Sequence, residues 1–524
     1  MVLLVPIAVF LLAITVLHVL TKLWLNRYVR ALPPGPRGLP ILGNVSDMPK
    51  PGVLECHHWF EHKKKYGPIS SVTVMGQTIV IINDATIALD LLRDRSGIYS
   101  SRPSLTFSGD MVGWRHVTAM MPYSDTWKIH RRNIKKITST ATSLAEFDRI
   151  QETETAHFLA NLLDAPERLL DHIRHETGCV ILKVVYGYDI SRYKRDPLVD
   201  MAETTVAQFA EASVPGRWTV DTFPFLKYLP NWVPGTGFKK TAQTMSDQLI
   251  QCVNQPYAFV KQRMHEERQT PSFLSQSIAT IGTDADAEFI HKWTALALYL
   301  GGADTVRTVS ALSTFFLAMS LFPNIQVAAQ SELDAILGVP PRLPTAEDLP
   351  QLSYIEAVVK ETFRWHQVAP MGLPHTNTSS DTYSGYHIPQ GSIVLANIWA
   401  FMHDPSTYRD PFIFRPERFL GPEAEPDPRR HVFGYGRRIC PGKHMAERAL
   451  KATIASTLVV FSIEKEGEVE TTFCPGLLSH PSPFKCSIRA RSGVHEGVVR
   501  GVKERLVAQG DGRGDAEELE GVRW

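Results

Sequence analysis

The stretch FGYGRRICPGKHMAERAL, residues 433–450, places a single cysteine in a loop that precedes a helix-forming segment. The cysteine, Cys440, is flanked by three glycines: Gly434, Gly436 and Gly442. Glycines let the backbone turn tightly and approach a flat ligand closely. A helix that begins near Gly442 points its positive end toward Cys440, and with the two arginines of the loop it favours the thiolate form of a cysteine.

A thiolate in such a loop, without a partner cysteine, has two explanations. The first is a single axial bond to a haem iron, because an iron–sulfur cluster requires several cysteines. The second is a buried structural cysteine, which is the commoner role of a lone cysteine. The spacing alone favours neither.

The composition of the 524-residue chain narrows the class of protein. With 44% hydrophobic and 21% charged residues, the chain can bury a large core. A net charge of +1 gives no electrostatic basis for nucleic-acid binding, so we expect no nucleic-acid partner. The six cysteines are scattered without a CxxC pair, which predicts neither a disulfide scaffold nor a zinc site. A reducing compartment fits this pattern.

The N-terminus differs from the rest of the chain. Residues 2–20 are apolar except for Thr15 and His18, and this length is about that of a helix crossing the ~30 Å hydrocarbon core. A cleaved signal peptide is the alternative, but no basic residue precedes the run and no clear cleavage site follows it. Basic residues follow instead, which places the remainder in the cytoplasm. We therefore expect a transmembrane anchor over residues 1–22 that holds the rest of the chain at a membrane, on its cytosolic side.

Downstream of the anchor, the sequence predicts three further regions. Residues 23–44 are basic and proline-rich, and form either a plain linker or a rigid strut. Residues 45–490 combine a hairpin and helix over Ser70–Leu92, a helical middle and late strand signals, which predicts a mainly α catalytic domain with a minor antiparallel β region. Residues 491–524 are glycine-rich and charged, so we expect a mobile tail with at most one short helix, near Val499–Val507.

The pattern Phe433-x-x-Gly436-x-Arg438-x-Cys440-x-Gly442 resembles the cysteine-ligand loop of the cytochrome P450 family. The resemblance implies the fold of that family and a haem b cofactor (iron protoporphyrin IX). It makes Cys440 the proximal iron ligand, packs Phe433 against the sulfur and pairs Arg438 with a haem propionate. Gly436 and Gly442 are cofactor-binding residues by the same resemblance.

A second motif, LYLGGADTVRTVS at residues 298–310, lies in an apolar helical stretch that ends at Pro323. Adjacent glycines inside a helix cost about 1 kcal/mol each relative to alanine. They indicate either a break between two helices, with Asp304 or Thr305 as the N-cap, or a groove that function requires. The motif resembles the oxygen-binding helix of the family, in which the glycines make room for dioxygen while Thr305 and Asp304 deliver protons. Val306 replaces a second hydroxyl residue that the family often has.

The stretch KETFRW places Glu361 and Arg364 on one helix face. Such a pair is usually a solvated contact worth a few tenths of a kcal/mol. In the family it is buried behind the haem and joined by a later arginine, which resemblance assigns to Arg418 in FRPERF. Burying a carboxylate between two guanidinium groups is costly unless all are hydrogen-bonded, so we expect a structural triad and no catalytic role.

Three further residues are expected at the haem propionates. In YSDTWKIHRRNIKK, Ser124 or Asp125 caps a helix that carries Trp127 and Arg131 one turn apart. This pair is either a packed tryptophan beside a basic surface or, by resemblance, a propionate contact. His375, in MGLPHTNT, matches another propionate contact of the family and is otherwise a loop histidine.

The resemblance runs from the proline-rich segment to about Cys486 and implies a monooxygenase. One atom of O2 enters a lipophilic substrate and the other leaves as water, with electrons from NADPH through NADPH–cytochrome P450 reductase; cytochrome b5 is a second candidate donor. A predicted docking face for the reductase comprises Lys128, His130, Arg132, Lys135, Lys136, Lys443 and Arg448, although a solvated charged helix explains the same residues. A haem-thiolate isomerase or dehydratase, or a haem-binding sensor, are the alternatives.

The substrate follows least directly from the sequence. Apolar stretches match the pocket-lining regions of the family at residues 104–121, 298–303, 368–373 and near Leu477. Residues 214–235 are a candidate membrane contact. RWHQVAPMGLPH and FGYGRRICPG resemble fungal secondary-metabolism members related to O-methylsterigmatocystin oxidoreductase. The resemblance implies a terpenoid, polyketide or aromatic substrate.

Overall fold

The computed structural model describes residues 31–50, 52–191, 196–214, 216–282, 284–302, 306–508 and 514–522. The predicted anchor and the start of the linker lie outside these ranges, as do Asp304 and Thr305.

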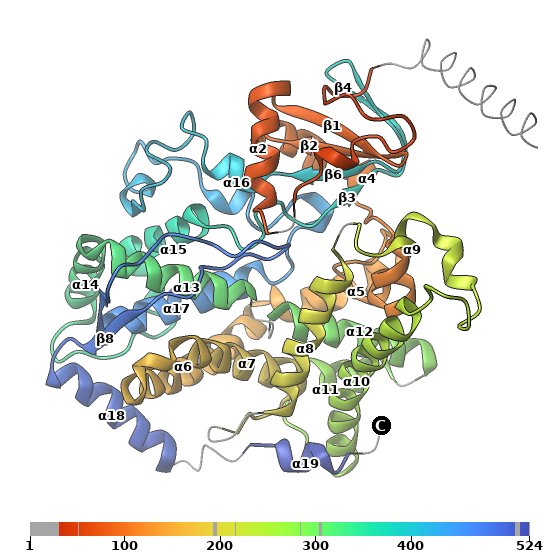
Figure 1. Cartoon of the computed structure of the whole chain (residues 1–524). Helices are drawn as coiled ribbons and strands as arrows, with labels where there is room; N and C mark the ends of the chain where they lie inside the picture. Colours follow the sequence, from red (N-terminus) through yellow and green to blue (C-terminus); the bar gives the residue numbers. More distant parts are fainter. Residues whose placement is uncertain are drawn as a thin grey trace, which may run out of the picture.

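The described chain is mainly helical. Its longer helices are α2 (Glu55–Tyr66), α5 (Asp125–Thr138), α6 (Ala141–Asp164), α7 (Leu169–Tyr186), α8 (Pro197–Ala212), α10 (Phe238–His265), α11 (Phe273–Ile281), α12 (Ala285–Gly302), α13 (Val306–Leu321), α14 (Pro323–Leu337), α15 (Ser353–Trp365), α17 (Lys443–Val460) and α18 (Gly493–Ala508). Shorter helices are α3 (Ala85–Ala88), α4 (Ser96–Tyr99), α9 (Thr219–Thr222), α16 (Ile398–Met402) and α19 (Ala516–Glu520). The helices form the main body, while the largest sheet stands at one end of it (Figure 1).

The predicted hairpin is confirmed. Strands β1 (Ile69–Val74) and β2 (Gln77–Ile82) pair antiparallel. The two residues between them, Met75 and Gly76, both have positive φ, 47° and 87°. A two-residue turn of this kind matches the twist of the flanking strands.

The prediction of an antiparallel β region is wrong in one place. The four-stranded sheet has the order β1-β2-β6-β3, and β2 pairs in parallel with β6 (Ile393–Ala396). Parallel neighbours need a long crossover, and the helical body between β2 and β6 provides one. The other pairs are antiparallel: β3 (His375–Thr376) with β6, β4 (Asp381–Tyr383) with β5 (Tyr386–Ile388), and β7 (Phe461–Lys465) with β8 (Cys486–Ala490).

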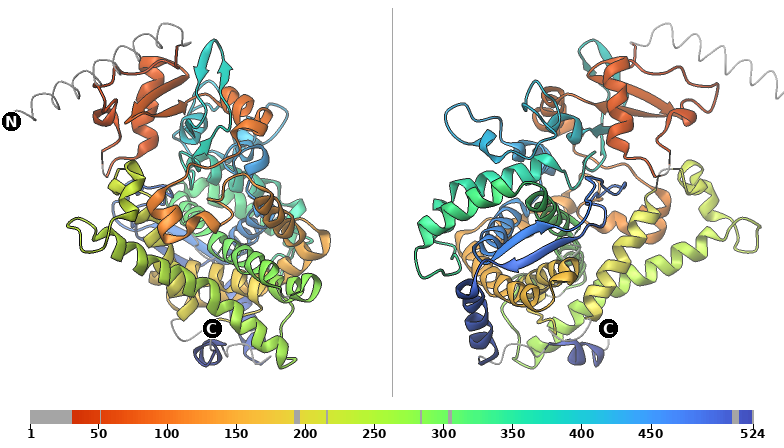
Figure 2. Two further views of the ribbon diagram at one scale, coloured as in Figure 1. Left: turned by 90° about the vertical axis from the view of Figure 1, so that its right-hand side faces the viewer. Right: turned by 60° about the vertical axis from the view of Figure 1, so that its left-hand side comes forward.

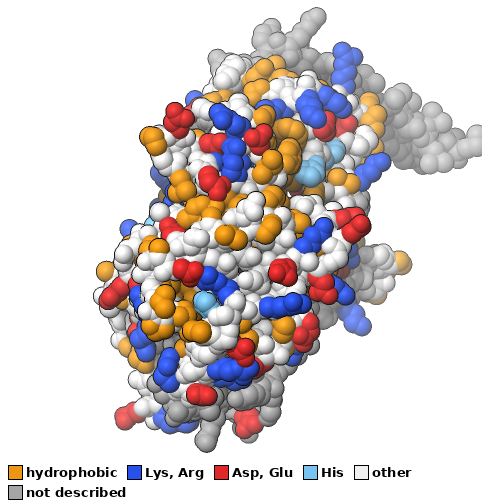
Figure 3. Space-filling view, turned by 90° about the vertical axis from the view of Figure 1, so that its left-hand side faces the viewer, with side chains coloured by type: hydrophobic (Ala, Val, Ile, Leu, Met, Phe, Trp, Pro, Cys, Tyr) orange, Lys and Arg blue, Asp and Glu red, His pale blue; other side chains and the backbone are white. Residues whose placement is uncertain are grey.

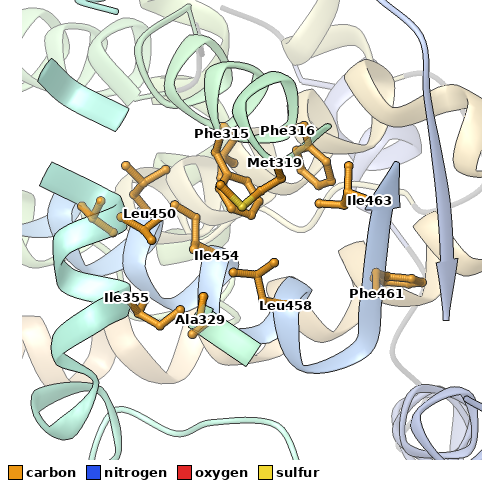
Figure 4. Close-up of a cluster of buried hydrophobic side chains, with 14 of the residues drawn as sticks. Phe315, Phe316, Met319, Ala329, Ile355, Leu450, Ile454, Leu458, Phe461 and Ile463 are labelled. Carbon is orange, nitrogen blue, oxygen red and sulfur yellow. The ribbon is translucent and has the colours of Figure 1, made fainter. Parts of the chain in front are cut away.

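A buried hydrophobic cluster lies between α13, α14, α15, α17 and β7. It packs against α17, the helix that follows the cysteine loop. Phe315, Phe316 and Met319 of α13 point toward Ile454 and Leu458 of α17, and all five are fully buried (Figure 4). Since α17 follows Cys440 directly, this packing fixes the helix that begins at the loop.

The C-terminal tail was predicted to be mobile with at most one short helix, and its described residues form two helices, α18 and α19, that both pack against the body. α18 contacts α6, with Val499 only 1% exposed, and α19 contacts α10. In α19, Leu519 is fully buried, and Glu518 binds Arg263 of α10 at 2.7 Å. Both helices lie at the end of the body away from the large sheet (Figure 2). Burial of Leu519 and the ion pair between Glu518 and Arg263 offset the conformational entropy that is lost when this segment becomes ordered.

Within the described ranges, no single helix is long and apolar enough to cross a membrane. One pair, 308–321 with 323–337, meets the length and composition test jointly, across a bend of 106°. The face that carries α14 and α18 shows Lys and Arg side chains interspersed with Asp and Glu, in keeping with the near-zero net charge (Figure 3).

Candidate active site

The cysteine loop lies between a short 3-10 turn, Gly436–Arg438, and the start of α17. The backbone N–H of Cys440 donates to the carbonyl oxygen of Phe433 at 2.8 Å, which closes the loop on itself. The Phe433 ring packs edge-on against Phe363 of α15, with the centroids 5.2 Å apart. The loop is therefore held both by its own backbone and by a helix of the core.

The three glycines of the loop have different roles. Gly434 (φ 79°) and Gly442 line a cavity, and a Cβ on Gly442 would meet nothing within 4 Å. Gly436 is not among the described residues that line this cavity, and its role in cofactor binding stays a prediction. With φ at 51°, a Cβ on Gly436 would lie 2.7 Å from the carbonyl oxygen of Leu92 and 2.8 Å from Cβ of Ser96. Glycine is required there for backbone packing.

The cavity has a volume of about 370 Å³, and Cys440 is one of its lining residues. All four stretches predicted to line a pocket contribute residues to it: 114 and 117–120, 298 and 300–302, 368–369 and 371–373, and 477–478. The lining also includes most of the other predicted site residues: Trp127, Arg131, His375, Phe433, Arg438 and Gly442. Segments from α5, α12, α15 and the cysteine loop therefore meet at one place.

One wall of the cavity is basic. The Arg438 guanidinium donates to the carbonyl oxygens of Ser100 at 2.6 Å and Met121 at 2.7 Å, and lies 4.4 Å from the ring centroid of Trp127. Burial, and next the charge of Arg131, lower the pKa of Arg438 to about 9. The protein thus holds two guanidinium groups in the wall at an electrostatic cost.

No Asp or Glu in the described part of the chain pairs with these two guanidinium groups. Arg131 lies beside Trp127, 5.6 Å from the ring centroid, and burial lowers its pKa. Neither Arg131 nor Arg438 forms an ion pair with a described residue. A buried cationic pair of this kind fits an anionic ligand group, and a carboxylate such as a haem propionate satisfies it.

His375 lies on the same wall. Its Nδ1 is 2.7 Å from the carbonyl oxygen of Tyr99, so Nδ1 carries the proton and donates. Burial, followed by the charge of Arg102, holds the pKa of His375 well below its ordinary value, and the ring is neutral. Nε2 of the neutral ring is then an acceptor.

Sequence reasoning missed Arg102, which also lines the cavity and is 6% exposed. It donates to the carbonyl oxygens of Ala119 at 3.0 Å, Leu373 at 2.9 Å and Pro374 at 2.7 Å. Its partners are backbone atoms up to 272 residues away, so no local pattern around Arg102 points to them.

The proposed oxygen-binding stretch is described up to Gly302 and again from Val306. The predicted proton-delivery residues, Asp304 and Thr305, lie outside the described residues. Both glycines line the cavity, but their surroundings differ. A Cβ on Gly301 would meet nothing within 4 Å, whereas one on Gly302 would lie 2.6 Å from Cδ1 of Ile181.

The predicted triad is brought together at the buried end of α15. Glu361 binds Arg364 at 2.7 Å and Arg418 at 3.1 Å, and all three side chains are 0% exposed. The backbone N–H of Arg415 adds a further hydrogen bond to Glu361 at 2.8 Å. Both guanidinium groups also donate to loop carbonyls, including those of Met402 and Arg409. Such full hydrogen bonding is what a buried ionic cluster requires.

The predicted basic docking face is only partly at the surface. Arg132, Lys135 and Lys136 are exposed on α5. His130 is fully buried, and its Nδ1 lies 3.0 Å from Oγ1 of Thr118, so its place on that face is corrected. Because α5 carries charged side chains on most of its turns, the sequence suggested that His130 is also at the surface, but His130 lies on the inward face of the helix.

Comparison with known proteins agrees with this geometry. The family model described as Cytochrome P450 matches residues 33–488. Cytochrome P450 monooxygenase claR of Ampulloclitocybe clavipes is 44% identical over 92% of this chain and 91% of its own length. Cytochrome P450 monooxygenase CLM2 of Gibberella zeae is 40% identical, over 93% of this chain and 94% of its own length. O-methylsterigmatocystin oxidoreductase of Aspergillus flavus is 37% identical over 93% of each chain.

The cavity thus combines a half-buried cysteine at a helix N-terminus, a basic wall fit for propionates and a largely apolar remainder, in a chain that the family model matches over most of its length. The chain belongs to the cytochrome P450 family and is a haem-dependent monooxygenase.

Proposed function

We propose that this monooxygenase oxidises a lipophilic small molecule, by hydroxylation or a related oxidation, as a tailoring step in fungal secondary metabolism. The observation that carries the proposal is the apolar part of the cavity that also contains Cys440. The fungal origin of the relatives supports the biological setting. The name of one relative refers to a methylated sterigmatocystin, which agrees with an aromatic polyketide as one candidate substrate.

The lining residues support a large, flat or hydrophobic substrate. Trp114 and Phe209 form a ring pair in the cavity wall, with centroids 4.2 Å apart. Val206 of α8 and Leu298 of α12 extend the same apolar surface. An apolar wall binds a hydrophobic substrate by burying its apolar surface. It offers few hydrogen-bonding groups that could bind a polar substrate.

Haem supplies activation of O2 for insertion of one oxygen atom, with electrons that we propose come from NADPH through a reductase. The residues of this chain would hold the haem and orient it in the cavity. Cys440 would bind the haem iron through its sulfur, and Arg131, Arg438 and His375 would hold the propionates. Thr305 and Asp304 remain the proposed source of protons. On α5, Arg132, Lys135 and Lys136 are exposed without an acidic partner in the described part of the chain, and so are candidates for reductase docking.

We also propose attachment to the endoplasmic reticulum membrane through residues 1–22, with the body in the cytosol. Exposed apolar side chains in the α8–α10 connection support a membrane-facing surface. Phe225 is 62%, Tyr228 78% and Trp232 82% exposed. Aromatic residues of this kind favour the membrane–water interface. Removal of residues 1–30 should release the protein from the membrane fraction.

The central test is the absorption spectrum of the reduced protein with carbon monoxide. Wild type should show the strongly red-shifted Soret band of thiolate-ligated haem, and Cys440→His should lose it while retaining haem. Cys474→Ser is the matched control, because Cys474 is half-buried but does not line the cavity, and it should keep the band. A haem-loaded wild type without the band would overturn the proposal.

Turnover then separates the alternatives. A monooxygenase consumes NADPH and O2 when reductase and a lipophilic ligand are present. A haem-thiolate isomerase or dehydratase would convert its substrate without NADPH, and a sensor would bind ligands without consuming NADPH.

A further inference from the structure

A buried carboxyl group lies in the cavity wall, remote from the basic wall in sequence. Glu176 of α7 is 2% exposed and is one of the lining residues. Gln151 of α6 and Thr453 of α17 line the cavity beside it. Neither the cysteine loop nor the triad uses this carboxyl group, and nothing in the family motifs above refers to it.

The hydrogen bonds of Glu176 are one-sided. Its Oε1 accepts from Gln151 Nε2 at 3.0 Å, Thr155 Oγ1 at 2.8 Å and Thr453 Oγ1 at 2.9 Å. Its Oε2 is buried and has no hydrogen-bond partner among the residues that the structure describes. Three donors on one oxygen orient the carboxyl group, and the second oxygen is left to carry either a proton or an unpaired charge.

Within the described part of the chain, the charged groups near Glu176 do not neutralise it. Glu154, on α6, is 3% exposed and raises the pKa of Glu176 through its negative charge. Lys183, on α7, lies 4.0 Å from Glu154, and His157, on α6, is also buried. The described residues of α12 and α13 present only uncharged side chains to the cavity: Ala297, Leu298, Leu300, Gly301, Gly302, Thr308, Ala311 and Leu312. The other titratable side chains among the described lining residues are Arg102, Arg131, His375, Tyr435, Arg438 and Cys440.

Burial is the largest cause of a raised pKa at Glu176, which reaches about 7 in spite of the three donors. A carboxyl group that titrates near neutrality can change its protonation with small changes in nearby charge. One-electron reduction adds one negative charge to the cavity. In a poorly solvated wall, a like charge disfavours the carboxylate and favours the acid.

We propose that Glu176 takes up a proton from solvent when the haem of this enzyme is reduced, so that electron and proton uptake are linked at this side chain. The electron comes from the redox partner, and a solvent hydronium ion gives up the proton, so that one of its O–H bonds breaks as an O–H bond forms at Oε2 of Glu176. Glu176 is therefore a positioning residue for charge and does not touch the reacting atoms. The inference rests on the haem cofactor of the family and goes beyond the proposed substrate and pathway.

The test is to measure the reduction potential of the haem-loaded protein at several pH values between 5.5 and 8.5. Each potential is obtained from a reductive titration that is monitored by the absorption spectrum. Linkage predicts that the wild-type potential falls with rising pH, with a slope approaching ~59 mV per tenfold change in proton concentration around the pKa of Glu176. Glu176→Gln keeps an oxygen acceptor for the three donors but cannot titrate. Its potential should be flat over the same window.

Two further variants separate linkage from structural damage. Thr453→Val removes one hydrogen-bond donor that stabilises the carboxylate form of Glu176, while Glu176 itself can still titrate. The pKa of Glu176 should rise, so the sloping region should move to higher pH. Glu154→Gln removes a neighbouring negative charge, so the sloping region should remain and move to lower pH. A purely structural role for Glu176 predicts neither shift.

The outcomes are distinguishable from failure of the proposed function. If wild type shows the thiolate band but Glu176→Gln retains the wild-type slope, the linkage at Glu176 is overturned and the monooxygenase remains. If wild type itself shows no slope, the inference also falls. If the thiolate band is absent from haem-loaded wild type, both proposals fail together.

Discussion

Arg131 and Arg438 reach one wall of the cavity from α5 and from the cysteine loop, and the charge of Arg131 adds to burial in lowering the pKa of Arg438. The pair is stabilised only when an anion joins it, because like charges that are poorly solvated repel strongly. The site is therefore prepared for its cofactor before the cofactor binds.

Substitution of either arginine should weaken haem retention. Arg438→Gln removes a charge-assisted hydrogen bond to a carboxylate, worth ~1.5–3 kcal/mol, so haem should dissociate roughly 10- to 100-fold faster. Haem transfer to excess apomyoglobin measures this rate. Arg132→Gln, the adjacent and exposed position on α5, is the control and should match wild type. Equal rates for Arg438→Gln and wild type would contradict the propionate assignment.

The triad should be essential to stability while a surface pair of the same spacing is not. Glu361→Gln leaves two guanidinium groups buried without a carboxylate, which costs ~3–5 kcal/mol. Glu146 and Arg149 have the same i,i+3 spacing, but their side chains are 57% and 73% exposed. Glu146→Gln should therefore change the free energy of unfolding by less than ~1 kcal/mol. Urea unfolding compares the two variants, and similar midpoints would show that the triad is dispensable.

Glu176 should make the stability depend on pH. Its pKa is raised from 4.5 to about 7 in the folded state. The folded protein therefore keeps a proton that the unfolded chain releases. This contribution is fully present below about pH 4.5 and is lost as pH rises through about 7. Glu176→Gln has no titrating group at this position and lacks this contribution. The free energy of unfolding of the variant should therefore rise relative to that of wild type by roughly 3 kcal/mol between pH 4.5 and 8. Thermal melts across this range provide the measurement, and a constant difference would be inconsistent with a titrating Glu176.

The adjacent glycines of α12 should respond differently to a methyl group. Gly302→Ala places its Cβ against Ile181, at 2.6 Å before relaxation, and overpacking of this kind costs about 1–3 kcal/mol. Gly301→Ala meets open space and gains up to about 1 kcal/mol of helix propensity. The Gly301 methyl group instead takes volume from the cavity. Thermal melts should rank Gly301→Ala above Gly302→Ala, and the reverse ranking would contradict the described packing.

The C-terminal helix should contribute measurably to stability. Leu519→Ala removes a fully buried side chain, so a loss of ~2–5 kcal/mol is expected. Val494→Ala, at a residue that is 61% exposed on α18, is the matched control and should cost less than ~0.5 kcal/mol. Hydrogen exchange at the C-terminal end of α10 should also increase in Leu519→Ala. Unchanged exchange there would mean that α19 does not support α10.

Local patterns in the sequence predicted those parts of the fold that local physics determines. The hairpin at Met75–Gly76 follows from its turn residues, and Ser124 caps α5 through a 3.2 Å hydrogen bond from Trp127. The family motifs added long-range pairings that no spacing argument provides, such as Glu361 with Arg418.

The remaining features depend on neighbours that are distant in sequence. The parallel pairing of β2 with β6 depends on the path of the intervening helices. The role of Gly436 depends on the carbonyl group of Leu92, and the three donors to Glu176 come from two other helices. The composition of the tail suggested disorder because it says nothing about Arg263, the partner that binds it.

The sheet order β1-β2-β6-β3 also has a consequence for biosynthesis. Ile79 of β2 pairs with Ile393 of β6, so the chain must be extended by about 300 residues before the partner of β2 exists. At ~5–20 residues per second, translation of that length takes roughly 15–60 s. During this time the edge of β2, with the sequence QTIVII, is an open template for intermolecular pairing. The nascent hairpin therefore has to be shielded on the ribosome, and heterologous expression of this enzyme should benefit from slower growth or added chaperones.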